Sequence, residues 1–445
     1  MAPFTLGPTC GPRRHGSQSC IHSRSRRAPA SPQRGPEEVP WGIRPAGGFP
    51  TIRDPGPHSA REVLREFLRL GIVGFGGPSA HIALFRQRFV RELGWLDEQR
   101  FLDLLGTANL LPGPTSTEVA LAIGQARSGL RGLLAAGLGF IGPAVVAVLL
   151  LAAGYQQFGS RPEIGWILYG VQPVVVAVVA VAVAGLAPAA VRGPATLVIA
   201  GAAAAGTLLG MDPILVIGAA LLCGLVLALG RRRGTGVGWL TAVAALPVVG
   251  SGGGAKARLG ELLIGGLAAT SLPGLFLLFL KIGVLSFGSG YVLLAFLRTD
   301  LVGPGLLTDR QLIDAVAIGQ VTPGPVYTAA TFIGYLLGGV GGAAVATVGV
   351  FLPAFVGVAL VHPFVPRLRG SVTAAGFLDA INAASLGLIA AVTVQLARAT
   401  LVDAITVALA LASLAVLVRL PRAAVPLIVG GGLVGLAVHA AGLAG

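Results

Sequence analysis

The chain has 445 residues, of which 54% are hydrophobic and only 11% are charged, and its mean hydropathy is +0.82. Because soluble domains carry about 25% charged residues, this composition excludes an ordinary soluble protein and indicates an integral membrane protein surrounded by lipid. Much of the net charge of +14 comes from arginines at the ends of apolar segments. Such arginines set membrane topology, so we expect no nucleic-acid partner.

The first segment, 1–57, is rich in Pro, Gly, Ser and Arg and shows no apolar periodicity. It also lacks the apolar run of about 7–15 residues that forms the core of a signal peptide. We predict that it is a disordered basic tail. After it we expect a first repeat at 58–233, a linker at 234–258 and a second repeat at 259–445.

A glycine-rich segment interrupts the first apolar helix of each repeat. The first reads Phe75-Gly-Gly-Pro-Ser-Ala-His81 and the second reads Phe287-Gly-Ser-Gly-Tyr291. Glycine destabilises a helix interior, and proline removes a backbone donor and clashes with the preceding turn. Non-helical backbone at membrane depth is tolerated only where it is buried in protein or lines a cavity. The breaks therefore mark a candidate site, with helix packing and kinking as the alternative.

A Pro-Gly-Pro motif follows in each repeat. Asn109-Leu-Leu-Pro-Gly-Pro-Thr-Ser-Thr-Glu118 is matched by Gln320-Val-Thr-Pro-Gly-Pro-Val-Tyr-Thr328. Because proline is favoured in the first turn of a helix, each motif should start a new helix, and helix starts attract anions. Two such starts, brought together by a pseudo-twofold axis, would form a pocket for a dianion. The hydroxyls of Ser116, Thr117 and Thr328 would either add donors or cap their own helix.

Four ionisable side chains lie in or beside these apolar segments. Arg69 and Lys281 occupy equivalent repeat positions, where they would balance the substrate charge or extend to the membrane interface. Glu118 is a candidate for proton coupling, with a capping or ion-pair role as the alternative. His81 has a side chain that titrates near neutral pH, yet a hydrogen-bonded structural histidine is the more common reading.

Long apolar stretches recur along the rest of the chain, and each can supply the about 20 residues that a membrane-spanning helix needs. The segment Val174–Leu186 is apolar on every side, unlike the alternating strands of a membrane β-barrel. We therefore predict an all-α, polytopic transmembrane bundle. The predicted stretches are 133–154, 164–187, 194–230, 259–280, 339–361, 371–397 and 402–442.

The body of the chain repeats itself. Phe67–Gly77 aligns with Phe279–Ser289 without a gap, and Asp103, the first Pro-Gly-Pro motif and Pro143 recur in order as Asp314, the second motif and Pro353. Weak internal symmetry of this kind is typical of transporters built from repeats, in which broken helices form the binding site.

Loop charge indicates that the two repeats are inverted, because cytoplasmic loops collect Lys and Arg. Arg127 and Arg131 precede the span 133–154, whereas the matching residues 338–342 carry no charge. At the far end of the span the bias reverses, since the second repeat carries two arginines within 367–369. The loop that carries Arg127 and Arg131 should thus lie on the cytoplasmic side, and residues 338–342 should lie outside.

These motifs resemble those of the chromate ion transporter family over about 60 to 440. The first half reads FGGPSAHIALFRQRFV and GWLDEQRFLDLLGTANLLPGPTSTEVALAIG, and the second reads FGSGYVLLAFLRTDLV and LLTDRQLIDAVAIGQVTPGPVYTAATFIGYLLGG. The resemblance implies a two-domain carrier in the inner membrane that expels chromate using the proton gradient. It also leaves open a sulfate-like anion as substrate, and a homodimer. The long basic tail is not a feature of the family.

No enzyme motif accompanies this pattern: the sequence has no His-Glu-x-x-His, no Gly-x-Ser-x-Gly and no Walker loop. We expect a carrier without a metal or other cofactor, and a channel is the alternative. The candidate substrate-binding residues are Arg69, Phe75, Gly76, Gly77, Pro78, His81, Asn109, Pro112, Gly113, Pro114, Ser116, Thr117, Glu118, Lys281, Phe287, Gly288, Ser289, Gly290, Gln320, Thr322, Pro323, Gly324, Pro325 and Thr328.

Overall fold

The computed structural model describes residues 59–75, 77–108, 111–159, 161–232, 271–287, 290–361, 372–420 and 423–442. The predicted tail 1–57, the predicted linker 234–258 and the start of the second repeat lie outside these residues. Within them the prediction of an all-α fold is confirmed, because every regular element is helical and the only bridge of β type joins Pro112 to Phe287.

The helices come in the same order in both halves of the chain. The first half contains α1 (Ala60–Val73), α2 (Gly77–Phe85), the π-helix η1 (Arg86–Glu92), α3 (Glu98–Ala108), α4 (Thr115–Phe158), α5 (Pro162–Ala190), α6 (Pro194–Leu208) and α7 (Pro213–Arg232). The second contains α10 (Leu272–Leu285), α11 (Val292–Leu297), η2 (Arg298–Val302), α12 (Asp309–Val321), η3 (Val326–Thr328), α13 (Ala329–Val361), α15 (Val372–Thr400), α16 (Ala404–Arg419) and α17 (Ala424–Ala440). The predicted repeat is thus visible in the helices themselves.

Local sequence explains where many of these helices begin. The Ser59 hydroxyl accepts a hydrogen bond from the Arg61 amide at the start of α1, and Thr308 and Gln311 form a capping box at the start of α12. Asp403 caps α16 in the same way. Prolines occupy the first turn of α5, α6 and α10, where the missing N–H has no helical partner to lose.

Two of the longest helical elements are hairpins. In α4 the backbone leaves the helical region at Ser128 (φ −141°) and Gly129 (φ 59°), and in α13 it does so at Gly338 (φ −147°) and Gly339 (φ 59°). The arms then fold against each other, since Gly124 faces Gly132 in the first hairpin and Gly334 faces Gly342 in the second. We define the first hairpin as Thr115–Phe158 and the second as 326–361.

The short arm of each hairpin cannot cross a membrane. Residues 115–127 form a helix about 20 Å long at about 1.5 Å per residue, whereas the hydrocarbon core is about 30 Å thick. Among the described residues, 4 helices have the length and apolar composition of a membrane span, and two of them contain the long arms 130–158 and 340–361. The others are Pro162–Ala190 and Gly376–Thr400. A hairpin whose turn lies at one membrane surface therefore places its Pro-Gly-Pro motif inside the membrane, at the buried end of the short arm.

The two hairpins run in opposite directions. Gly137, early in the long arm of the first hairpin, faces Phe355, which is late in the long arm of the second. Tyr155, near the end of the first hairpin, packs on Phe332 with ring centroids 5.2 Å apart, and the short arm that holds Phe332 lies against the start of 340–361. The long arms are therefore antiparallel, which is the arrangement of inverted repeats.

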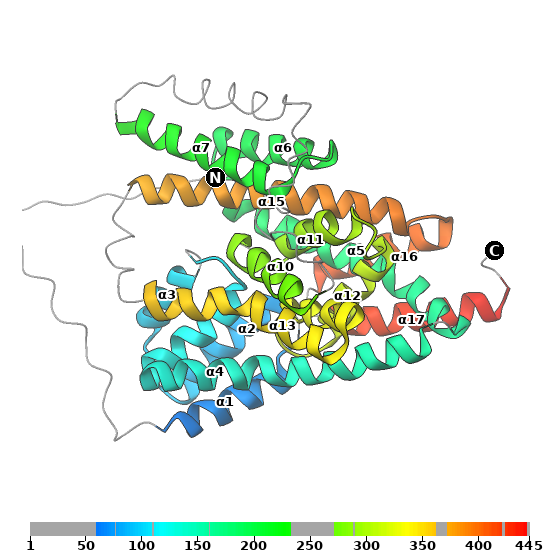
Figure 1. Cartoon of the computed structure of the whole chain (residues 1–445), viewed down its shortest axis with the longest axis horizontal. Helices are drawn as coiled ribbons and strands as arrows, with labels where there is room; N and C mark the ends of the chain where they lie inside the picture. Colours follow the sequence, from blue (N-terminus) through cyan, green and yellow to red (C-terminus); the bar gives the residue numbers. More distant parts are fainter. Residues whose placement is uncertain are drawn as a thin grey trace, which may run out of the picture. The chain divides into compact units, whose positions relative to one another are not determined.

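The later helices of each half pack against the other half. Helix α5 lies along α16 and α17, and α15 lies along α6 and α7; Figure 1 shows α15 in orange beside the green helices α6 and α7. The contacts are close, since a side chain added at Gly170 in α5 would meet the backbone of Gly431 and Gly435 in α17. Small residues allow this approach, and the halves cannot separate without breaking these pairs.

Candidate anion site

Each helix break meets the Pro-Gly-Pro motif of the opposite half. The Gly113 amide donates a hydrogen bond to the Ser286 carbonyl at 2.7 Å, and the Gly324 amide donates one to the Gly74 carbonyl at 2.8 Å. The two bonds are symmetric under the repeat. Gly74 and Ser286 lie at the C-terminal ends of α1 and α10, where their carbonyl groups have no partner within the helix. Each bond supplies a backbone partner to one of these carbonyl groups within the membrane.

Both central glycines adopt a backbone that other residues rarely take. Their φ angles are 142° at Gly113 and 111° at Gly324, a region where only glycine avoids a clash with its own side chain. A Cβ added at Gly113 would also lie 2.9 Å from Glu118 Oε1, and one added at Gly324 would lie 2.7 Å from the Ala144 side chain. These positions therefore require glycine for both conformation and space.

New helices start directly after the motifs, as the sequence predicted. Pro114 is the N-cap of α4, and Pro325 precedes η3, which continues into α13. The Thr328 hydroxyl donates to the Pro325 carbonyl at 2.9 Å, so it caps its own helix. The Thr117 hydroxyl is fully buried and has no hydrogen-bond partner among the described residues, and Ser116 beside it is buried as well.

Three polar side chains gather where the two halves meet, and we call Glu118, Ser286 and Tyr327 the buried polar cluster. The Tyr327 hydroxyl lies beside the Ser286 hydroxyl and within electrostatic range of Glu118. All three residues are 0% exposed. Their side-chain oxygens have no hydrogen-bond partner of good geometry within the described part of the chain. The ion-pair alternative for Glu118 is not realised with any described arginine or lysine.

Other polar residues of the predicted site are already engaged. His81 is 1% exposed, and its Nε2 lies 3.0 Å from the Gly74 carbonyl, which is the structural role that the sequence allowed. The Gln320 amide donates to the Tyr291 hydroxyl at 2.6 Å. The Thr322 hydroxyl donates to the Ile318 carbonyl at 2.9 Å. These hydrogen bonds fix the side chains that lie around the helix breaks.

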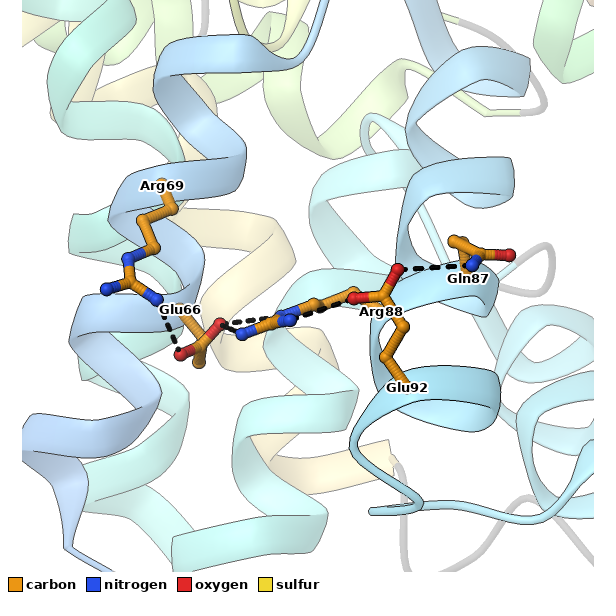
Figure 2. A network of polar contacts seen from close by, with 5 residues as sticks. All are labelled: Glu66, Arg69, Gln87, Arg88 and Glu92. Carbon is orange, nitrogen blue, oxygen red and sulfur yellow. Dashed lines mark hydrogen bonds and ion pairs between the residues drawn. The ribbon is translucent and has the colours of Figure 1, made fainter.

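Arg69 and Lys281 lie in different surroundings despite their equivalent positions. The Arg69 side chain is 64% exposed and donates to Glu66, as Figure 2 shows. The Lys281 ammonium is 9% exposed and lies 2.6 Å from Asp300 of η2. Neither side chain is free in this conformation, so their predicted role in balancing the substrate charge requires these pairs to open.

An ion pair ties the first helix of each half to its π-helix, with the charges reversed. In the first half, Glu66 of α1 accepts from Arg88 of η1 at 2.8 Å, and Arg88 also pairs with Glu92 at 2.8 Å (Figure 2). Hydrogen bonds from Arg88 and Gln87 lower the pKa of the Glu92 carboxyl. In the second half the pair joins Lys281 of α10, the equivalent of Arg69, to Asp300 of η2.

By burial, the remaining predicted residues within the described ranges form three groups. Phe75 is exposed, whereas Gly77 and Gly290 are buried and Pro78, Pro112, Phe287 and Pro323 are half-buried. Gly76, Asn109, Gly288 and Ser289 lie outside the described residues. Sequence reasoning missed Ser286 and Tyr327. Ser286 directly precedes the second helix break and Tyr327 lies within the second Pro-Gly-Pro segment. Their position beside Glu118 depends on contacts between distant segments, which the sequence does not show. No group of three His, Cys, Asp or Glu residues able to hold a metal occurs in the described ranges.

The inverted hairpins, the crossed helix breaks and the apolar spans define a multi-pass membrane protein of the inverted-repeat transporter class. The profile of the family described as chromate transporter matches residues 61–225 and 274–436, one match for each repeat. The chain belongs to the chromate transporter family. No solved structure matches it.

Curated relatives agree with this assignment. The chain is 34% identical over 345 residues to a chromate transport protein of Pseudomonas aeruginosa, covering 77% of this chain and 82% of the relative. It is 29% identical over 392 residues to a chromate transport protein of Cupriavidus metallidurans, covering 86% and 94%. A probable chromate transport protein of Synechococcus elongatus is 28% identical over 347 residues, covering 77% and 85%.

Proposed function

We propose that this protein exports chromate across the inner membrane as a secondary active transporter that draws on the proton gradient. The observation that carries the proposal is the meeting of two helix starts with the two helix breaks inside the membrane. Helix starts present N–H groups without helical partners and the positive end of the helix dipole. Two of them converging on one place suit a substrate with two negative charges.

The substrate and the direction rest on two further arguments. Relatives at 29–34% identity bear the name chromate transport protein, and we extend that substrate to this chain. Export of a dianion is favoured by a membrane potential that is negative inside, which is worth about 2.3 kcal/mol per charge for each 100 mV. Because proton pumping maintains this potential, the proton gradient supplies the energy.

Another tetrahedral oxyanion, sulfate above all, is the second candidate substrate. The potential donors at the site are backbone amides and hydroxyl groups such as that of Thr117. Such groups recognise charge and tetrahedral shape and do not by themselves separate chromate from sulfate. A channel for the same anions is a related alternative, and the crossed backbone bonds that close the described conformation favour a carrier.

The test is uptake of labelled chromate and sulfate into inverted membrane vesicles, with and without an imposed proton gradient. We expect saturable chromate uptake that rises when the vesicle interior is made positive, the polarity of the cell exterior. Vesicles from cells that lack the protein provide the control. Uptake of sulfate alone would reassign the substrate, and uptake that neither saturates nor responds to the gradient would indicate a channel.

A further inference from the structure

The carboxyl group of Glu118 lies beside the first Pro-Gly-Pro motif. It is 0% exposed, and neither of its oxygens has a hydrogen-bond partner among the described residues. An ionised carboxylate held in this way lacks both water and a counterion, so the protonated, neutral form is the one that burial permits.

The surroundings of Glu118 do not supply a competing charge. The helices packed against α4 carry the charged or titratable residues Arg61, Glu62, Arg65, Glu66, Arg69, His81, Glu98, Arg100, Asp103, Asp309, Arg310, Asp314, Tyr327 and Tyr335. Of these, only Tyr327 interacts electrostatically with Glu118. Glu66 and Glu98 are paired with arginines, His81 is bonded to Gly74, and Asp314 accepts hydrogen bonds from Tyr155 and Gln172.

Glu118 is also in the right place to meet an anion. It lies in the first turn of the short arm, and its Oε1 would lie 2.9 Å from a Cβ at Gly113, so the carboxyl group sits beside the Pro-Gly-Pro motif. An ionised Glu118 would repel a dianion there. A protonated Glu118 would instead donate a hydrogen bond to it, as would the hydroxyls of Ser286 and Tyr327.

We propose that Glu118 binds one proton together with the oxyanion, so that each anion is carried with one proton. This inference rests on the proposed function, since it assigns the proton site of that same pocket. When the pocket opens to water without substrate, Glu118 ionises. When the dianion enters, Glu118 takes a proton and donates it to an oxyanion oxygen as a hydrogen bond. The counterpart position in the second half is Ala329, so one proton, not two, accompanies the anion.

This coupling determines which component of the proton gradient, the electrical or the chemical, drives export. A dianion that leaves with one proton carries a net charge of minus one, so the inside-negative potential drives its export. A pH difference that is alkaline inside opposes the same export, because a proton leaves as well. The proposal therefore separates the electrical from the chemical component of the gradient.

Proton uptake on anion binding tests the proposal directly. Purified protein in weakly buffered detergent solution receives chromate at a series of pH values, and a pH dye records the protons taken up. We expect the parent protein to take up one more proton per bound anion than Glu118→Gln, whose amide imitates the neutral acid. Subtracting the proton uptake of the variant from that of the parent removes the contribution of protons that bind to chromate itself. Glu163→Gln, which changes an exposed carboxyl in α5, should behave as the parent does.

Affinity gives the second readout. Above the pH at which Glu118 ionises in the open pocket, chromate affinity of the parent should fall about tenfold more per pH unit than that of Glu118→Gln. Equal proton uptake and parallel pH profiles would overturn the proposal. If Glu118→Gln does not fold, infrared difference spectra of the parent still decide, because chromate should increase the absorption of a protonated carboxyl and its absence contradicts us. A parent that binds neither chromate nor sulfate at any pH would instead contradict the proposed function.

Discussion

At the residue scale, the pair of Lys281 and Asp300 shows how one charge can serve stability rather than substrate. The two side chains are 9% and 14% exposed and lie 2.6 Å apart. An ion pair at this depth gains little over two apolar side chains, but removal of one partner leaves a buried charge alone. Replacing only one of the two residues should therefore reduce stability more than replacing both.

We predict that Lys281→Met destabilises the protein by about 3–5 kcal/mol, measured by thermal unfolding in detergent. Lys281→Met combined with Asp300→Leu should recover most of the loss. The control is Arg69→Met at the equivalent position. There the arginine is 64% exposed and Glu66 keeps its pair with Arg88, so the lost pair is worth less than about 1 kcal/mol. Normal stability of Lys281→Met with lost chromate binding would show instead that Lys281 turns to the anion.

Residue chemistry also explains what could be read from the sequence. Glycine and proline act locally, so the breaks at Phe75–His81 and Phe287–Tyr291 and the helix starts after the Pro-Gly-Pro motifs follow from the residues themselves. Tyr327 could not be recognised in this way, because it looks like one more large side chain in an apolar run. Its position beside Ser286 and Glu118 arises only when distant segments meet.

At the element scale, the two hairpins depend on one glycine each. Gly129 and Gly339 share a φ of 59° with ψ near −150°, a region that residues with a side chain almost never occupy. Nothing lies within 4 Å of a Cβ added at either position. The requirement for glycine in these turns is thus conformational and not steric.

We predict that Gly129→Ala and Gly339→Ala each destabilise the protein by about 1–3 kcal/mol through backbone strain alone. Gly154→Ala is the matched control, because Gly154 lies in the helical part of the first hairpin with nothing within 4 Å of the added Cβ. That change should be neutral or stabilising by up to about 1 kcal/mol. Thermal unfolding of the three variants makes the comparison, and equal effects at all three sites would contradict the turn assignment.

The sequence does not show which helices pack against each other. The segments that became α5 and α15 are apolar on nearly every side, so their composition predicts burial but does not say against which helix. Helix α5 packs on α16 and α17, and α15 packs on α6 and α7. Both contacts depend on the close approach of two backbones at glycines such as Gly170 and Gly387. Sixty-seven glycines are present, and the sequence does not mark which of them meet another helix.

At the scale of the whole molecule, inverted repeats place the two hairpin turns on opposite sides of the membrane. The charge pattern predicts that the first turn lies on the cytoplasmic side. Leu130 and Val340 follow the two turns at equivalent positions and are 63% and 69% exposed. They are therefore a matched pair of labelling sites that avoids the strained glycines.

We predict that Val340→Cys reacts with a membrane-impermeant thiol reagent added outside cells and that Leu130→Cys does not. The background protein carries serine in place of Cys10, Cys20 and Cys223. After the membrane is made permeable, both positions should react, which controls for local access. Reaction of both positions from one side would contradict the inverted arrangement.

The two hairpin turns are held by forces of different kinds. Near the first turn, Arg127 lies 4.6 Å from the centre of the Trp95 ring and 3.8 Å from Glu62. Near the second, Gly338 and Gly342 face the side chains of Leu272 and Leu275. Added salt screens the attraction of charges, whereas strongly hydrated salts such as sulfate strengthen apolar contacts. A strongly hydrated salt should therefore weaken the contacts at the first hairpin turn while strengthening those at the second.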